Sequence, residues 1–559
     1  TEEPRYLERG EALLEAGCDD PLVRFIVAWL TFQIHHDWLE VLEDCERAVA
    51  EFDQRGTPPA AARLAGVETT ILYKRARKEK RLAALDTWIT RWTRQAIEAG
   101  DYAGEDAKIL AHHVLLPGWD DHLERNPEAI EALFREADVA EWLRCAVLGA
   151  VETKKAWRDR GAGWAYKVTE EGWKGFFEHL GKAAPLLRRS WELRPDCPQA
   201  ASKMIAVVMG GGGEPGETER LWFDRAVAAQ FDYAPAYHAM AWALRPRWGG
   251  SHEEMLAFGR ACLCTKRFDT LVPLFYLEIL NDICKERKDW RTLYRDPQIA
   301  REVMDLNRAL LEAPTRKQEI PGRLSHIVVN GWLCGDLDEA RRALERLDGG
   351  LLPNVDIRMA QHGIDRAVML GDIALSGDPV REDVALAGMA ARSKSYAEAL
   401  RRFRDARDRC QNDCGRRFID SRIDAILIEQ ELGKGGWVDI TPKGTLRAWS
   451  VLNGRWEADD AGGIINHGDD GRGTILSHVD PGRDFELRGS FRVDAPKDCC
   501  QGLGIALGFR KGDDGADEEN WFTCVHSRTE RGTPWATCMN RYRWDKETQP
   551  LARPGILPD

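Results

Sequence analysis

The stretch ETERLWFDRAVAAQFDYAPAYHAMAWALRPRWGGSHEEMLAFGRACLCTKRF occupies residues 217–268, and its pattern decides the predicted fold. Apolar residues recur at helical spacing in two successive runs, and Pro235 stands in the first turn of the second run, where proline is tolerated. Ser251 and Glu254 have the spacing of a capping box, which predicts a third helix. Short helices of this kind cannot bury their apolar faces alone, so the stretch predicts a stacked helical repeat array.

The helical pattern extends over most of the chain. Asp20 and Pro21 provide a cap and a first-turn proline for an expected pair of helices, which is interrupted at residues 35–37 and ended by Gly56. Another helix is expected to begin near Pro198. These boundaries predict consecutive helical hairpins joined by short connections.

Three short motifs carry a family resemblance. The residues GDLDEA at 335–340 resemble the turn and second-helix start of a tetratricopeptide repeat, as do YAEA at 396–399 and the helix exit LRP at 193–195. The resemblance covers roughly residues 20–433, although the first-helix signature is incomplete in every copy and the spacing departs from about 34 residues. It implies a tetratricopeptide-like α-solenoid that binds a protein or peptide through its concave face, and it carries over no catalytic residue.

The composition changes after Glu431. Residues 433–436 have the content of a linker, and 17 of the 124 residues from Gly436 onward are glycine, against 33 of the preceding 435. Apolar and polar residues alternate over residues 484–493, as in a half-buried strand. Other strands are expected at residues 463–466, 473–478, 502–509 and 521–527. Short strands with frequent turns predict an antiparallel β-sandwich.

This C-terminal segment resembles a concanavalin-like jelly roll of the type labelled 3-keto-disaccharide hydrolase. The similar residues are WSV at 449–451, GRW at 454–456 and DFELRGSFRV at 484–493. The segment is shorter than such domains usually are, so a truncated or reduced sandwich is expected.

The predicted fold class is therefore multidomain α + β, with a tetratricopeptide-like α-solenoid followed by an antiparallel β-sandwich. Three segments are expected: an N-terminal helical-hairpin region at residues 1–175, tetratricopeptide-like repeats at 176–433, and the concanavalin-like sandwich at 434–559.

Composition restricts the function classes. The 79 Lys and Arg and 92 Asp and Glu residues give a net charge of −13, which argues against a nucleic-acid partner. No apolar run of about 18 residues occurs, so no transmembrane segment is expected. The chain begins with Thr1, and a removed signal peptide fits this start. The 14 cysteines and the sandwich resemblance favour a periplasmic or extracellular location, with a cytoplasmic one as the alternative.

Two irregular segments interrupt the helical pattern. Residues 161–175 are rich in glycine and aromatic residues and predict an irregular loop. In the second segment, Arg245, Arg247 and Trp248 are candidate partner-binding residues, because arginine and tryptophan are common in binding hot spots. The alternative is a simple interhelix turn with Trp248 packed inward and both arginines paired with local acids.

The C-terminal segment offers two further candidate sites. Trp449, Trp456, Trp521 and Trp535 could bind a glycan, although core packing is the favoured interpretation for at least half of them. Asp513, Asp514 and Asp517 offer clustered oxygen ligands for calcium, with a solvated hairpin turn as the alternative. No other cofactor is indicated.

The sequence thus favours a non-catalytic scaffold that binds a protein through its solenoid and a partner or glycan through its sandwich. One alternative is a carbohydrate-active hydrolase acting on a sugar derivative, although no pair of carboxylates can be nominated. A structural subunit of a larger assembly is the other alternative. No catalytic residue is proposed.

Overall fold

The structure is a computed structural model of the 559-residue chain. It describes residues 3–35, 38–75, 79–115, 122–313, 320–347, 364 and 366–432, together with short strands between residues 449 and 541. The chain divides into two compact units, and each is described by itself.

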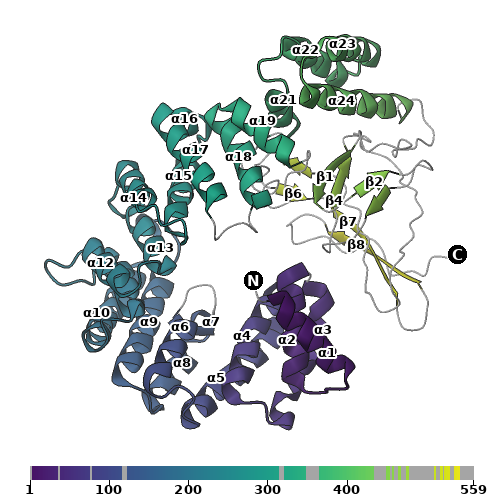
Figure 1. Ribbon diagram of the computed structural model, residues 1–559. Coiled ribbons are helices and arrows are strands. Elements are labelled where there is room, and N and C mark those ends of the chain that lie inside the picture. The colour runs from purple at the N-terminus through teal and green to yellow at the C-terminus, as the bar shows by residue number, and fades with distance from the viewer. Residues whose placement is uncertain are drawn as a thin grey trace. The chain divides into compact units, whose positions relative to one another are not determined.

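The first unit is helical throughout its described part (Figure 1). Its elements are α1 (Glu3–Glu15), α2 (Pro21–His35), α3 (Trp38–Arg55), α4 (Pro59–Arg75), α5 (Glu79–Glu98), η1 (Gly104–Asp106), α6 (Ala107–Leu115), α7 (His122–Arg125), α8 (Pro127–Glu136), α9 (Glu141–Arg160), η2 (Ala165–Lys167), α10 (Glu170–Leu193), α11 (Pro198–Met209), α12 (Glu219–Ala229), α13 (Ala234–Ala243), η3 (Pro246–Trp248), α14 (His252–Cys264), η4 (Val272–Leu274), α15 (Phe275–Arg287), α16 (Arg291–Arg295), α17 (Pro297–Glu312), α18 (Ile320–Cys334) and α19 (Leu337–Arg346).

Helix boundaries follow the local signals in the sequence. Helix α2 begins at Pro21, and α3 ends at Arg55, directly before Gly56 with its φ of 66°. The three helices predicted within residues 217–268 are α12, α13 and α14. Ser251 caps α14, because its hydroxyl oxygen accepts a hydrogen bond from the backbone N–H of Glu254 at 3.1 Å.

The irregular loop predicted at residues 161–175 is shorter than expected. Helix α10 already begins at Glu170, because Thr169 caps it by accepting a hydrogen bond from the Gly172 N–H at 3.0 Å. The helix start was not predicted, because the high glycine content of residues 161–175 is typical of a loop. The irregular part is therefore confined to the residues between Gly161 and Thr169, including the single turn η2.

The apolar core of the first unit is a series of clusters rather than one centre. One cluster runs from Phe25 to Trp92, the next from Ala96 to Cys197, and a third from Ala156 to Ile283. Helices that follow each other pack together, as in the pairs α2–α3, α4–α5, α9–α10, α11–α12 and α18–α19. Cores that pass from one helix pair to the next define a helical repeat fold, which confirms the predicted array.

In the part that the structure describes, the second unit contains four helices and eight short strands. Its helices are α21 (Arg366–Ala374), α22 (Arg381–Arg392), α23 (Tyr396–Arg409) and α24 (Asp413–Leu432). Its strands are β1 (Trp449–Asn453), β2 (Trp456–Ala458), β3 (Ile464–Asn466), β4 (Thr474–Ser477), β5 (Phe509–Lys511), β6 (Asp517–Glu519), β7 (Trp521–Arg528) and β8 (Pro534–Arg541). Ala399, Phe403 and Ala406 form the buried face of α23, as the sequence predicted.

The predicted β-sandwich is wrong. The described strands form four separate antiparallel pairs, β1–β4, β2–β3, β5–β6 and β7–β8, and no larger sheet forms among them. A jelly roll requires two multi-stranded sheets packed face to face. The concanavalin-like fold, and the α + β class built on it, are therefore corrected to a helical repeat fold with isolated strand pairs. Glycan binding and carbohydrate hydrolysis depended on the sandwich, so neither is retained.

Two further predictions concern the membrane and the cysteines. Among the described helices, none is both long and apolar enough to span a bilayer. The ten cysteines before Gly436 lie in described residues and form no disulfide with one another, and Cys410 and Cys414 are buried. Cys499 and Cys500 lie outside the described residues.

Candidate functional site

The two irregular segments singled out in the sequence meet in space. Trp248, in η3, packs edge-on against Trp157 of α9, with ring centroids 5.3 Å apart. Arg247 lies over Trp164, which directly precedes η2, with 5.9 Å from guanidinium carbon to ring centroid. We call the residues Arg160, Trp164, Trp242, Arg245, Arg247 and Trp248 the arginine–tryptophan junction.

The inner layer of this junction is organised by Arg160, the last residue of α9. Its side chain is buried, and its guanidinium carbon lies 5.6, 5.4 and 4.9 Å from the ring centroids of Trp157, Trp173 and Trp248. Its Nη1 donates hydrogen bonds to the carbonyl oxygens of Gly161 at 3.1 Å and Gly163 at 3.2 Å. Arg160 thereby ties the irregular segment to η3 through backbone hydrogen bonds and cation–π contacts.

The outer layer is exposed. Trp164 is 61% exposed and Trp242, on α13, is 39% exposed. The Arg247 guanidinium carbon lies 4.9 Å from the Trp242 ring centroid and 5.4 Å from that of Trp248. Contact between large aromatic rings and water is unfavourable, so a partner that covers these rings would gain binding free energy.

Arg245 is held differently from Arg247. It stacks on Trp242 at 4.2 Å and pairs with Asp282 of α15, and its Nη1 lies 3.6 Å from a Glu286 carboxylate oxygen. Arg247 has no ion pair or side-chain hydrogen bond to any residue that the structure describes. One arginine of the pair is therefore neutralised and structural, whereas the other presents an uncompensated charge.

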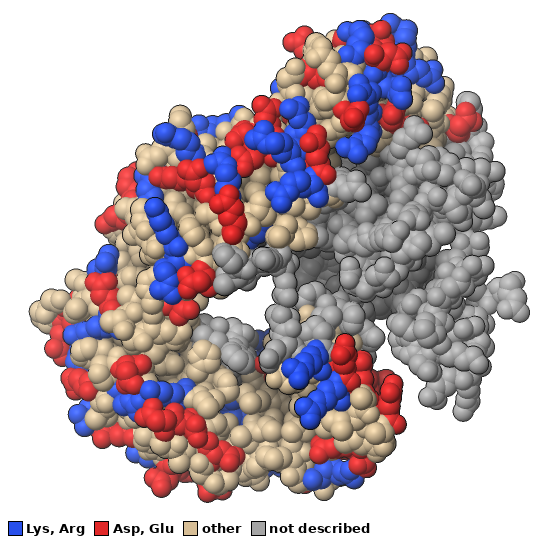
Figure 2. All heavy atoms as spheres, viewed as in Figure 1, with Lys and Arg blue, Asp and Glu red and all other residues tan. Residues whose placement is uncertain are grey.

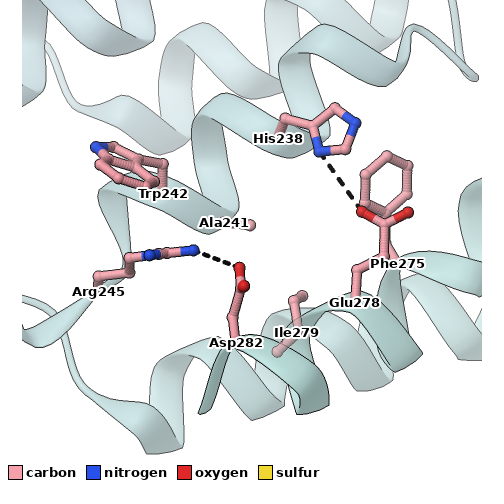
Figure 3. A pocket seen from close by; sticks show the side chains of 8 residues that line it. All are labelled: His238, Ala241, Trp242, Arg245, Phe275, Glu278, Ile279 and Asp282. Atoms are coloured by element: carbon pink, nitrogen blue, oxygen red, sulfur yellow. Dashed lines mark hydrogen bonds and ion pairs between the residues drawn. The ribbon is translucent and has the colours of Figure 1, made fainter. Parts of the chain in front are cut away.

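A small pocket adjoins the junction (Figure 3). It lies between α13 and α15, has a volume of about 130 Å³, and is lined by His238, Ala241, Trp242, Arg245, Phe275, Glu278, Ile279 and Asp282. In Figure 3, Trp242 and Arg245 stand at one end and His238, Phe275 and Glu278 at the other. Small-molecule sites usually have about 300–1,000 Å³, so this pocket suits a single side chain better than a whole substrate.

The charge of Arg247 stands out from its surroundings. Figure 2 shows Lys and Arg interspersed with Asp and Glu over the helices. Typical arginines are paired, such as Arg188 with Glu217 at 2.9 Å and Arg260 with Glu302 at 2.9 Å. Burial lowers the pKa of Arg160, and the nearby positive charge of Arg247 lowers it further. The junction thus carries a positive charge at Arg247 that no described carboxylate pairs with.

The other predicted site residues are not brought together by described contacts. Trp449, Trp456, Trp521 and Trp535 lie in strands β1, β2, β7 and β8, and their side chains lie outside the described residues. Asp513 and Asp514 also lie outside them, and only the backbone of Asp517, at the start of β6, is described. Within the described part of the chain, no group of three or more His, Cys, Asp or Glu residues could hold a metal ion.

Sequence reasoning named Arg245, Arg247 and Trp248 but missed Arg160, Trp164 and Trp242. Trp164 lies in the segment that was singled out for its glycine and aromatic content, so composition was a usable signal. Arg160 gave no local signal, because its role depends on the packing of η3, more than 80 residues later, against the end of α9.

Comparisons with known proteins add little. No protein-family model matches the chain, and no curated protein matches it. Among solved structures, the crystal structure of yeast Tom70 matches at 12% sequence identity, covering 78% of this chain and 97% of that one, with a TM-score of 0.14. A TM-score this low does not establish a shared architecture, so the fold and the junction are described from this chain's own contacts.

Proposed function

We propose that this protein is a helical-repeat interaction scaffold that binds a segment of a partner protein at the arginine–tryptophan junction. The observation that carries the proposal is the pair of exposed tryptophans, Trp164 and Trp242, that both contact the unpaired Arg247. Tryptophan and arginine, together with tyrosine, are enriched among the few residues that contribute most of the binding free energy at protein interfaces.

The local design supports this function. The buried Arg160 and the half-buried Trp248 hold the segment that carries Trp164, so the exposed rings are presented by a fixed framework. A fixed framework reduces the entropy lost on binding. The adjoining pocket can receive one side chain of the partner segment, which would fix the position of that segment along the junction.

Selection of peptides from a random displayed library against the full chain tests the proposal. We expect selected peptides to bind the Trp164→Ala/Trp242→Ala double variant at least about 10-fold more weakly, because both aromatic anchors are removed. Tyr6→Ala is the matched control, since Tyr6 is also an exposed aromatic residue, on α1, and its removal should leave affinity unchanged. Equal affinity for the double variant and the intact chain would contradict the proposal.

A further inference from the structure

The chemistry of the partner segment follows from the charges at the junction, and this inference rests on the proposed function. Arg160 and Arg247 are both cationic, and no described carboxylate forms an ion pair with either of them. Their mutual influence is seen in the Arg160 pKa, which the charge of Arg247 lowers. Because the two positive charges lie close together and neither is neutralised, binding of an anion at the exposed Arg247 is favoured.

Arg160 is a buried cation with an unused hydrogen-bond donor. Its side chain is only 7% exposed, and its Nε is a buried donor without a hydrogen-bond acceptor among the described residues. Placing an unpaired guanidinium in an aromatic enclosure costs solvation free energy. Cation–π contacts with three tryptophans recover part of that free energy, and an anion bound nearby would recover more.

Arg247 is arranged to receive the anion. Trp164, Trp242 and Trp248 lie against its guanidinium, and the side chain remains exposed. A guanidinium stacked on aromatic rings keeps its N–H edge available, and that edge matches the two oxygens of a carboxylate. The flanking tryptophans and the apolar pocket wall formed by Ala241, Phe275 and Ile279 suit apolar neighbours of the acidic residue.

We propose that the partner segment carries an aspartate or glutamate side chain that binds the exposed edge of Arg247, beside an apolar residue that covers Trp164 and Trp242. The anion is a side-chain carboxylate within the segment, because Arg247 contacts two exposed rings, and an internal acidic residue has neighbours before and after it that can cover both, whereas a chain terminus has a neighbour on one side only.

The experiment uses short amidated peptides selected on the full chain, so that a free C-terminal carboxylate is absent. The best binder is compared with its counterpart in which each Asp or Glu is replaced by Asn or Gln, by fluorescence anisotropy. We expect Asp and Glu to be enriched in the selected pool and the amide counterpart to bind at least 10-fold more weakly, a loss of about 1.4 kcal/mol. Raising the ionic strength should weaken only the acidic peptide.

Two substitutions locate the contact. Arg247→Ala should weaken the acidic peptide by about 10-fold and leave the amide peptide unchanged, so that the two changes are coupled. Arg267→Ala is the matched control: Arg267 also lies over an aromatic ring, 5.0 Å from the Phe231 centroid, but it is neutralised by Asp269 at 2.7 Å. Both arginines are exposed, and circular dichroism melting of each variant checks that its fold is retained.

The outcomes separate the two proposals. Peptides that depend on Trp164 and Trp242 but show no acidic enrichment and no effect of Arg247→Ala would overturn the carboxylate inference and leave the docking function standing. Binding that requires a free C-terminal acid would overturn it as well. Peptides that bind independently of Trp164 and Trp242 would overturn the docking function itself.

Discussion

Two connections between helices of the first unit have opposite characters. The turn between α18 and α19 is short: Gly335 adopts a φ of 89°, and the Asp336 side chain accepts a hydrogen bond from the Glu339 N–H at 3.2 Å. The connection between α13 and α14 is longer and contains η3, whose Arg247 is exposed and contacts two exposed tryptophans, Trp242 of α13 and Trp164 before η2. The polar groups of the short turn are paired within the turn, whereas the long connection presents an unpaired guanidinium beside exposed aromatic rings. Unpaired side chains on a rigid scaffold are typical of binding loops.

The largest difference should be seen between two thiols at helix ends: Cys334 ends α18 at the short turn, and Cys264 ends α14 at the end away from the long connection. Cys334 is the last residue of α18, and burial raises its pKa to about 12, so its thiol stays protonated at mildly alkaline pH. Cys264 is the last residue of α14 and is exposed. We expect iodoacetamide at about pH 8 to modify Cys334 more than about 100-fold more slowly than Cys264, because the thiolate is the reactive form.

Mass spectrometry of the labelled peptides measures both rates in one sample. Denaturant should make the two rates similar, since unfolding removes the burial that raises the pKa of Cys334. Comparable rates in the folded protein would show that the thiol at the α18–α19 turn is as accessible as the exposed Cys264.

The next effect concerns the close packing of the short turn. A Cβ at Gly331 would lie 2.9 Å from the Ala340 Cβ and 2.9 Å from the Asp336 carbonyl oxygen. Gly331→Ala should therefore lower the free energy of unfolding by about 1–2 kcal/mol through overpacking. The same substitution at Gly181, an exposed glycine in α10 with open space around its Cβ position, should raise it by about 0.5–1 kcal/mol.

Urea unfolding of both variants measures these changes. If Gly→Ala lowers the free energy of unfolding at position 331 and raises it at position 181, the difference measures the effect of packing apart from helix propensity. A stabilised Gly331→Ala variant would mean that α18 and α19 approach less closely than the structure shows.

Local signals in the sequence were sufficient for the short turn and for most helix starts. Asp336, Ser251 and Pro198 each act within a few residues, so their caps and first turns could be predicted from spacing. The junction was predicted only in part. Arg247 and Trp248 were identified by composition, but their contacts with Trp164 and Arg160 join segments about 80 residues apart, and no periodic pattern encodes such a contact.

The C-terminal prediction failed for a related reason. Alternation and turn residues located β3, β4 and β7 close to their observed positions. Alternation shows that a segment is extended with two different faces, but it does not say which strand lies beside it. Trp449 pairs with Ser477 and Trp521 with Arg541, in separate two-stranded sheets, so correct strands were assembled into a wrong sandwich.

The smallest expected effect separates a structural arginine from a binding one. Arg308 lies beside the short turn and forms a two-point contact with Glu339, with Nε–Oε1 and Nη2–Oε2 distances of 2.9 and 2.7 Å. Exposed pairs of good geometry contribute about 0.5–1 kcal/mol, so Arg308→Ala should lower the free energy of unfolding by that amount, and less at high salt. Arg247→Ala removes no ion pair to a described residue, and the relief of repulsion on Arg160 offsets the loss of its cation–π contacts, so it should change stability by less than about 0.5 kcal/mol. Urea unfolding of both variants at low and high salt checks the contrast. If Arg247→Ala were as destabilising as Arg308→Ala, Arg247 would stabilise the fold as Arg308 does. The two connections would then differ in length but not in the role of their arginines.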